Sequence, residues 1–102
     1  MIQPQSINES INFQEGSVVS REIVNKSTGT VTLFAFDKDQ GLSEHKTPYD
    51  ALIIATDGRA IITVSGTVNE VKAGDYLLMP ANNPHSVKAL GPFKMILVMI
   101  KS

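Results

Sequence analysis

His45 and His85 are the only histidines in this chain of 102 residues, which contains no cysteine. An imidazole can ligate a transition metal, exchange a proton near neutral pH, or take part in packing. The absence of cysteine excludes disulfides, thiolate metal sites and cysteine nucleophiles. Metal or acid–base chemistry would therefore depend on the two imidazoles, together with the nearby carboxylates of Glu44 and Asp50.

The segment HSVKAL indicates the direction of the second histidine. Side chains alternate along a strand, so His85 shares a face with Val87 and Ala89, whereas Ser86 and Lys88 share the other. We therefore expect His85 to point toward the interior.

The segment GLSEHKTPYD, residues 41–50, gives the same expectation for the first histidine if it is extended. The inward set then contains His45, Thr47, Tyr49 and Ala51. The outward set contains Glu44, Lys46 and Asp50. Pro48 can introduce a bulge that shifts the register, and Asp50 would then turn inward.

The elements that must position these residues are strands. Turn residues recur roughly every eight to twelve residues, which is typical of an all-β sandwich or barrel. The short turns at Asp57-Gly58 and Ser65-Gly66 predict a meander of antiparallel strands. We expect residues 1–16 to be an N-terminal segment, either an edge strand or a short helical turn, and residues 17–102 to form one barrel domain. The expected strands are 17–25, 30–37, 50–56, 60–65, 67–71, 75–79, 85–90 and 93–101.

The last of these strands, FKMILVMI, is apolar on both faces after Lys94. A strand with two apolar faces needs a second layer or a partner subunit to cover it. We expect a homodimer that forms through the N-terminal and C-terminal strands.

Composition argues against two classes of function, nucleic-acid binding and membrane binding. The formal net charge is −1 and aromatic residues make up only 6% of the chain, so nucleic-acid binding is not expected. No apolar run approaches the ~20 residues of a membrane span, and the first residues lack the pattern of a signal peptide. We expect a cytoplasmic protein that does not bind membranes.

Two stretches, GLSEHKTPYDALIIATDG and GDYLLMPANNPHSVKAL, resemble the two conserved motifs of the cupin superfamily, most closely its short single-domain conserved-barrel members. The resemblance covers the chain from about Thr30 onward and implies an all-β, antiparallel jelly-roll (double-stranded β-helix) barrel. In the second motif Gly74, Pro80 and His85 keep the family spacing. Asn82 replaces the motif's glycine, and Ala89 replaces its final asparagine.

The first motif departs further from the family pattern. Cupins that bind metal typically have two histidines and a glutamate before a glycine. Counting back from Gly58, His45 matches the first histidine, while Thr47 and Ala51 replace the second histidine and the glutamate. A first-row metal generally needs three protein ligands. His45 and His85 supply two, and the third would be Asp50, Glu44 or, weakly, the Thr47 hydroxyl. For Asp50 we expect bonds to backbone amides at a strand edge in preference to a ligand role.

The resemblance leaves two functions open. The first is a domain that binds a small molecule in an internal pocket, with a divalent metal such as zinc, iron, manganese or nickel held weakly and at low occupancy. The second is a metal-dependent cupin enzyme, a dioxygenase, isomerase or decarboxylase. Loss of the second histidine and the glutamate favours the first function, and acid–base catalysis by the histidines without metal ranks below both.

Besides the histidines, the expected pocket residues are Phe34, Phe36, Thr47, Tyr49, Ala51, Met79, Phe93 and Met95. The methionines and phenylalanines could equally be packing inside the barrel, and Tyr49 could equally cover the barrel mouth.

Overall fold

Antiparallel strands account for most of the protein, whose computed structural model describes residues 2–102. Within that range the chain forms nine strands and no helix, and therefore no helix that could cross a membrane. The strands are β1 (Val18–Lys26), β2 (Gly29–Phe36), β3 (Gly41–His45), β4 (Asp50–Asp57), β5 (Arg59–Val64), β6 (Thr67–Lys72), β7 (Tyr76–Met79), β8 (His85–Ala89) and β9 (Phe93–Ile100).

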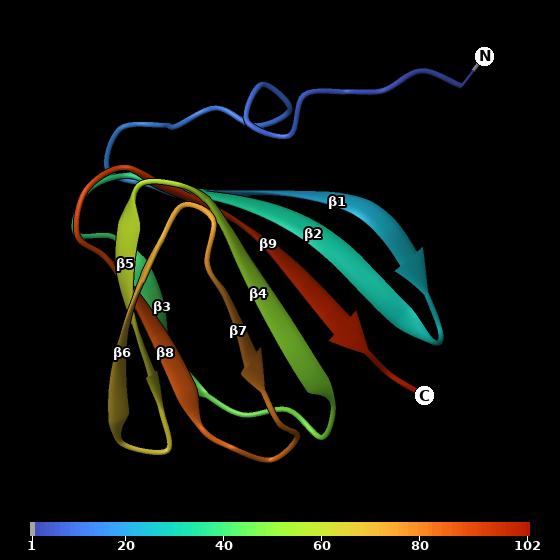
Figure 1. Cartoon of the computed structure of the whole chain (residues 1–102), viewed down its shortest axis with the longest axis vertical. Coiled ribbons are helices and arrows are strands. Elements are labelled where there is room, and N and C mark those ends of the chain that lie inside the picture. Colours follow the sequence, from blue (N-terminus) through green and yellow to red (C-terminus); the bar gives the residue numbers. More distant parts are fainter. Residues whose placement is uncertain (1) are drawn as a thin grey trace.

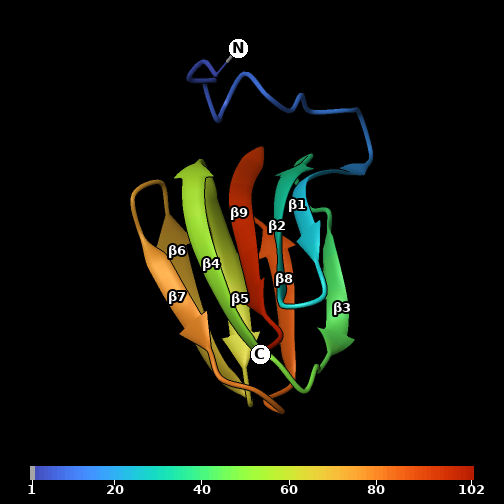
Figure 2. The ribbon, with the colours of Figure 1, turned by 90° about the vertical axis from the view of Figure 1, so that its right-hand side faces the viewer.

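The strands form two sheets that face each other (Figures 1 and 2). One has five strands in the order β1-β2-β9-β4-β7, and the other has four in the order β3-β8-β5-β6. This architecture confirms the all-β antiparallel barrel expected from the sequence.

The expected simple meander is wrong. Strands β4 and β5, joined by the turn at Gly58, belong to different sheets, and so do β6 and β7. Gly58 has a φ of 77°, and a Cβ there would lie 2.0 Å from the carbonyl oxygen of Pro92. The turn therefore passes the chain tightly across the end of the sandwich. By contrast, Ser65 and Gly66, both with positive φ, join β5 to β6 in an ordinary hairpin.

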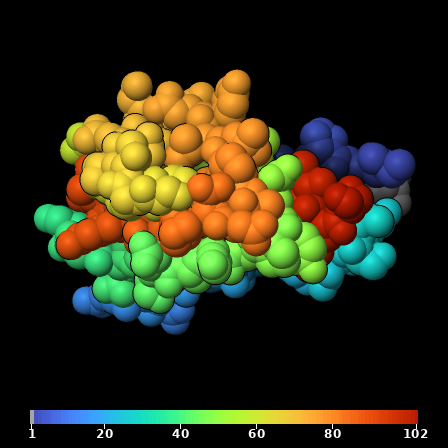
Figure 3. Space-filling model, turned by 90° about the horizontal axis from the view of Figure 1, so that it is seen from below, coloured from blue at the N-terminus to red at the C-terminus, as the bar shows by residue number. Residues whose placement is uncertain are grey.

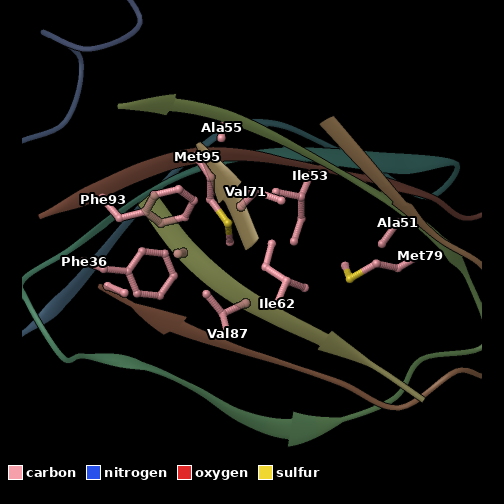
Figure 4. Packing of buried hydrophobic residues seen from close by; sticks show 12 residues of the cluster. Phe36, Ala51, Ile53, Ala55, Ile62, Val71, Met79, Val87, Phe93 and Met95 are labelled. Carbon is pink, nitrogen blue, oxygen red and sulfur yellow. The ribbon is translucent and has the colours of Figure 1, made fainter. Parts of the chain in front are cut away.

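The core lies between the sheets and consists of the side chains that point inward from the strands. Its largest fully buried side chains are Phe36, Ile53, Ile62, Met79, Phe93 and Met95. Burial of each such side chain contributes about 1.5–3 kcal/mol. Figure 4 shows Phe36 and Phe93 together at one end of the barrel, with Ala51 and Met79 toward the other.

The N-terminal segment lies on the outer face of the five-stranded sheet. Residues 7–9 form a turn, closed by a bond of 3.1 Å from the Ser10 amide to the Ile7 carbonyl, and residues 2–17 contain no strand. Ile11 is buried against Leu33 and Ala35. Lys94 is buried on the outer face of β9. Its Nζ donates to the Asn8 carbonyl and lies 4.8 Å from the centre of the Phe13 ring.

Candidate functional site

The two histidines meet where β3 ends beside the start of β8. His45 pairs directly with His85 across the two strands, and their ring centroids are 4.3 Å apart at an interplanar angle of 69°. An irregularity in the pairing between Leu42 and His45 sets this register. The structure thus brings together the two imidazoles that the sequence singled out.

Backbone carbonyls hold both rings through the same atom. The Nδ1 of His45 is 2.7 Å from the Ser43 carbonyl oxygen, and the Nδ1 of His85 is 3.1 Å from that of Asn83. A carbonyl oxygen can only accept, so each Nδ1 donates, and a ring in its neutral form then has its lone pair on Nε2. Metal-ligating histidines typically have this arrangement.

The two rings differ in their surroundings. The side chain of His85 is buried, with 7% of the residue exposed, whereas His45 is exposed. Burial lowers the pKa of His85 below its usual 6.5; the hydrogen bond to Asn83 opposes this change, and the neighbouring His45 adds to it. His85 is therefore neutral at pH 7.

Of the other proposed ligands, Asp50 and Thr47 are engaged in backbone contacts, and Glu44 is exposed on β3. Asp50 Oδ1 accepts a bond of 2.8 Å from the Ala81 amide. The strand ends at His45, so the expected alternation does not continue through the loop 46–49, where the Thr47 hydroxyl donates to the Tyr49 carbonyl at 3.0 Å. Over residues 2–102, no three histidine, aspartate or glutamate side chains are grouped so that they could hold a metal ion.

The loops at this end of the barrel support one another. Viewed from below, loop 46–49 (green) and loop 80–84 (orange) lie side by side (Figure 3). The Asn82 amide donates to the Thr47 carbonyl at 2.8 Å, and the Ser65 hydroxyl donates to Asn83 Oδ1 at 2.7 Å. Sequence reasoning missed Ser43 and Asn83 as residues that orient the histidines. Their contribution comes from backbone carbonyls, so no side-chain signal could have identified them.

The remaining expected pocket residues fall into two groups. Ala51 and Met79 are buried and pair across β4 and β7, and Ala51 also pairs with Met99 of β9. A methyl group between two methionines thus occupies the position of the family's glutamate. The second group comprises the residues of the packed core or the barrel rim: Phe36, Phe93 and Met95 in the core, Phe34 stacked on Phe36, and Tyr49, which is 37% exposed.

The imidazole pair fits part of a metal site. A metal–nitrogen bond of about 2.1 Å puts the ion roughly 3.2 Å from each ring centre. The ring centres would then be about 4.5 Å apart at the N–metal–N angle of about 90° of an octahedral ion, and about 5.2 Å apart at the angle of about 109° of tetrahedral zinc. The observed 4.3 Å is closer to the octahedral spacing. The anionic ligand is missing, so the donor set fits a weakly held ion.

Comparison with known proteins identifies the family. The sequence model described as "Cupin domain" matches residues 32–100. No curated protein matches the chain. A conserved protein of unknown function from Streptococcus pyogenes has a TM-score of 0.95 and 28% identity over 100% of this chain and 90% of its own. A cupin 2 conserved barrel domain protein from Leptotrichia buccalis has a TM-score of 0.89 and 38% identity over 92% of this chain and 46% of its own.

A cupin superfamily protein from Desulfitobacterium hafniense also shares the fold, with a TM-score of 0.95 and 24% identity over 100% of this chain and 94% of its own. The match of the family model covers more than half of the chain, and the fold agrees with those of the solved structures. The protein belongs to the cupin family.

Proposed function

We propose that this cupin binds a small molecule at the end of the barrel that carries His45 and His85, and that any divalent metal held there is held loosely. The observation that carries the proposal is the pair of free Nε2 atoms, because both Nδ1 atoms are engaged by backbone carbonyls. The two lone pairs point to ligands that donate hydrogen bonds through hydroxyl or amine groups. The apolar Ala51 and Met79 lie on β4 and β7 of the facing sheet, and small-molecule sites usually combine apolar side chains with a few polar groups.

Binding is favoured over catalysis by the missing anionic ligand. Ala51 offers no oxygen, and Asp50 already accepts from the backbone of the facing loop. Two neutral nitrogens do not satisfy the three-ligand requirement of a reactive metal. A cytoplasmic location remains a prediction from the sequence.

The second candidate is a metal-dependent cupin enzyme. The spacing of the two rings and their shared tautomer favour it, since His45 and His85 would ligate iron, manganese, zinc or nickel through Nε2. A bound metal would supply Lewis acidity and open coordination positions for substrate.

Zinc titration against a chromophoric chelator distinguishes the two functions. We expect protein purified without an affinity tag to contain less than one metal per chain and to bind zinc weakly. The His45→Ala, His85→Ala variant should lose this binding, and Asp50→Ala should keep it, because the Asp50 carboxylate serves the loop. One transition metal per chain that survives dialysis against a chelator, and that the double variant loses, would support the enzyme instead.

A further inference from the structure

The two histidine rings are fixed by carbonyls from different kinds of structure. The acceptor for His45 belongs to Ser43, which lies in β3. The acceptor for His85 belongs to Asn83, which lies between β7 and β8 and outside any strand. The Asn83 carbonyl is therefore placed by the hydrogen bonds of loop 80–84 rather than by a strand ladder.

The side chain of Asn83 makes three hydrogen bonds that shape this loop. Its Nδ2 donates to the carbonyls of Pro80 and Ala81 at 3.1 and 3.2 Å, which closes the loop on itself. Its Oδ1 accepts a bond of 2.7 Å from the Ser65 hydroxyl, which joins the loop to the β5–β6 hairpin. Any residue at position 83 has a carbonyl, but the place of that carbonyl here depends on the asparagine side chain.

Ser65 holds the loop at a second point. Its amide donates to the Pro84 carbonyl at 2.8 Å. The two acceptors of Ser65 therefore belong to Asn83 and Pro84, the residues joined by the peptide group whose oxygen binds His85 Nδ1. Val64, directly before Ser65, also pairs with His85 across β5 and β8.

Ser65 also has a backbone conformation that serine disfavours. Its φ is 48°, in the left-handed region that glycine and asparagine adopt with less strain. The following Gly66 has a φ of 82°, and hairpin turns with two positive φ angles most often contain Asn-Gly. The turn alone would therefore favour asparagine or glycine at position 65. A residue kept in a strained conformation points to a role beyond the turn.

We propose that Ser65 is a positioning residue for His85. Through the side chain of Asn83 it fixes the peptide oxygen that accepts from His85 Nδ1, and so it keeps the lone pair on Nε2 available to a ligand. The inference rests on the proposed function, because it ties the binding end of the barrel to the β5–β6 hairpin. The Ser65 hydroxyl should then matter more to the site than to the fold.

Two substitutions at this position separate the site from the fold. Ser65→Gly and Ser65→Ala both remove the hydroxyl, but glycine also relieves the backbone strain. The urea midpoint should stay equal or rise in Ser65→Gly and fall in Ser65→Ala. Both variants should nevertheless shift His85 toward the tautomer that carries its hydrogen on Nε2. A residue that served the turn alone would disturb His85 only where stability falls.

Long-range ¹H–¹⁵N NMR spectra report the tautomer at about pH 8.5, where an imidazole with an ordinary pKa of about 6.5 is neutral. We expect the Nδ1–H form of His85 in the wild type and a mixture in each variant. Zinc affinity, measured by chelator competition, should fall about threefold to tenfold, the effect of one lost hydrogen bond. Asp39→Gly is the matched control, because Asp39 has a φ of 66° and its amide bonds the Ala89 carbonyl at the far end of β8. It should change neither readout.

A double-mutant cycle tests whether the hydroxyl acts through Asn83. Asn83→Ala should weaken zinc binding at least as much as Ser65→Gly, and the double variant should match Asn83→Ala alone. Losses that add would overturn the proposal, as would an unchanged His85 tautomer in both Ser65 variants. A wild-type protein that binds no zinc would count against the proposed function, whereas the tautomer would still decide the role of Ser65.

Discussion

The two ends of the barrel are built from different chemistry. At one end Phe36 and Phe93 are fully buried, with ring centres 5.7 Å apart. At the other, His45 is exposed beside a buried His85, and the surrounding loops are held by backbone amides and short polar side chains. The aromatic end fills its volume, whereas the histidine end leaves two nitrogen lone pairs unused.

This difference separates stability from binding. Close packing of rings contributes to the free energy of unfolding but offers nothing to a ligand. The histidine end contributes less packing to the free energy of unfolding. Residues there can therefore be replaced by others with different donor atoms at a lower cost in stability. Three experiments test that separation, in decreasing order of expected effect.

Restoring the lost ligands should change metal affinity most. Zinc sites with four ligands bind with about 10–16 kcal/mol, so each added ligand contributes about 3 kcal/mol, or roughly 100-fold in affinity. Thr47→His with Ala51→Glu should therefore bind zinc roughly 10⁴-fold more tightly than the wild type, as measured by chelator competition. Adding His85→Ala to this variant should remove most of the gain. An unchanged affinity would mean that position 47 or 51 does not face the pair.

Truncating the aromatic end should mainly reduce stability. Phe93→Ala leaves a cavity in a fully buried position and should cost about 3–5 kcal/mol in urea unfolding. His45→Ala removes an exposed ring and should change the free energy of unfolding by less than about 0.5 kcal/mol. Equal losses at the two positions would contradict the separation of roles.

The free energy of unfolding should also depend on pH. This effect should be smaller than that of Phe93→Ala and should come from His85. Its pKa is lowered in the folded protein by burial, so the unfolded chain binds more protons as the pH falls below 6.5. The stability that neutral His85 contributes is thus present above pH 6.5 and is lost as the pH falls through the lowered folded-state pKa. Urea midpoints between about pH 7.5 and 5.5, measured with a chelator present, should decline in the wild type.

His85→Gln should flatten this decline, whereas His45→Gln, at the exposed ring, should keep most of it. A decline that is identical in the wild type and His85→Gln would assign the pH dependence to another group.

Much of the fold could be predicted from the sequence because it depends on local chemistry. Alternation correctly predicted the inward direction of His85, and the Ser65-Gly66 pair predicted the hairpin. The assignment of strands to sheets could not be predicted in this way, since the turn at Gly58 connects the two sheets as easily as it would connect neighbours in one. That choice depends on contacts between distant strands.

For the candidate site, spacing identified the two histidines but not the atoms that orient them. The direction of His45 relied on an extended chain through Thr47, and the structure instead ends the strand at His45. The backbone acceptors at Ser43 and Asn83 exist for any side chain at those positions. The expectation that Asp50 bonds a backbone amide is confirmed, but the amide is that of Ala81, 31 residues away in sequence, which no local pattern identifies.

Each histidine ring is fixed by a carbonyl two residues before it in the chain. The rotamers are therefore selected before anything binds, and a ligand or ion that reaches Nε2 avoids the loss of side-chain entropy, about 0.5–1.5 kcal/mol for each side chain, that ordering a free imidazole would require. This preorganisation matters more for two histidines than for a site with many donor atoms, because two donor atoms supply little binding energy to offset a loss of side-chain entropy.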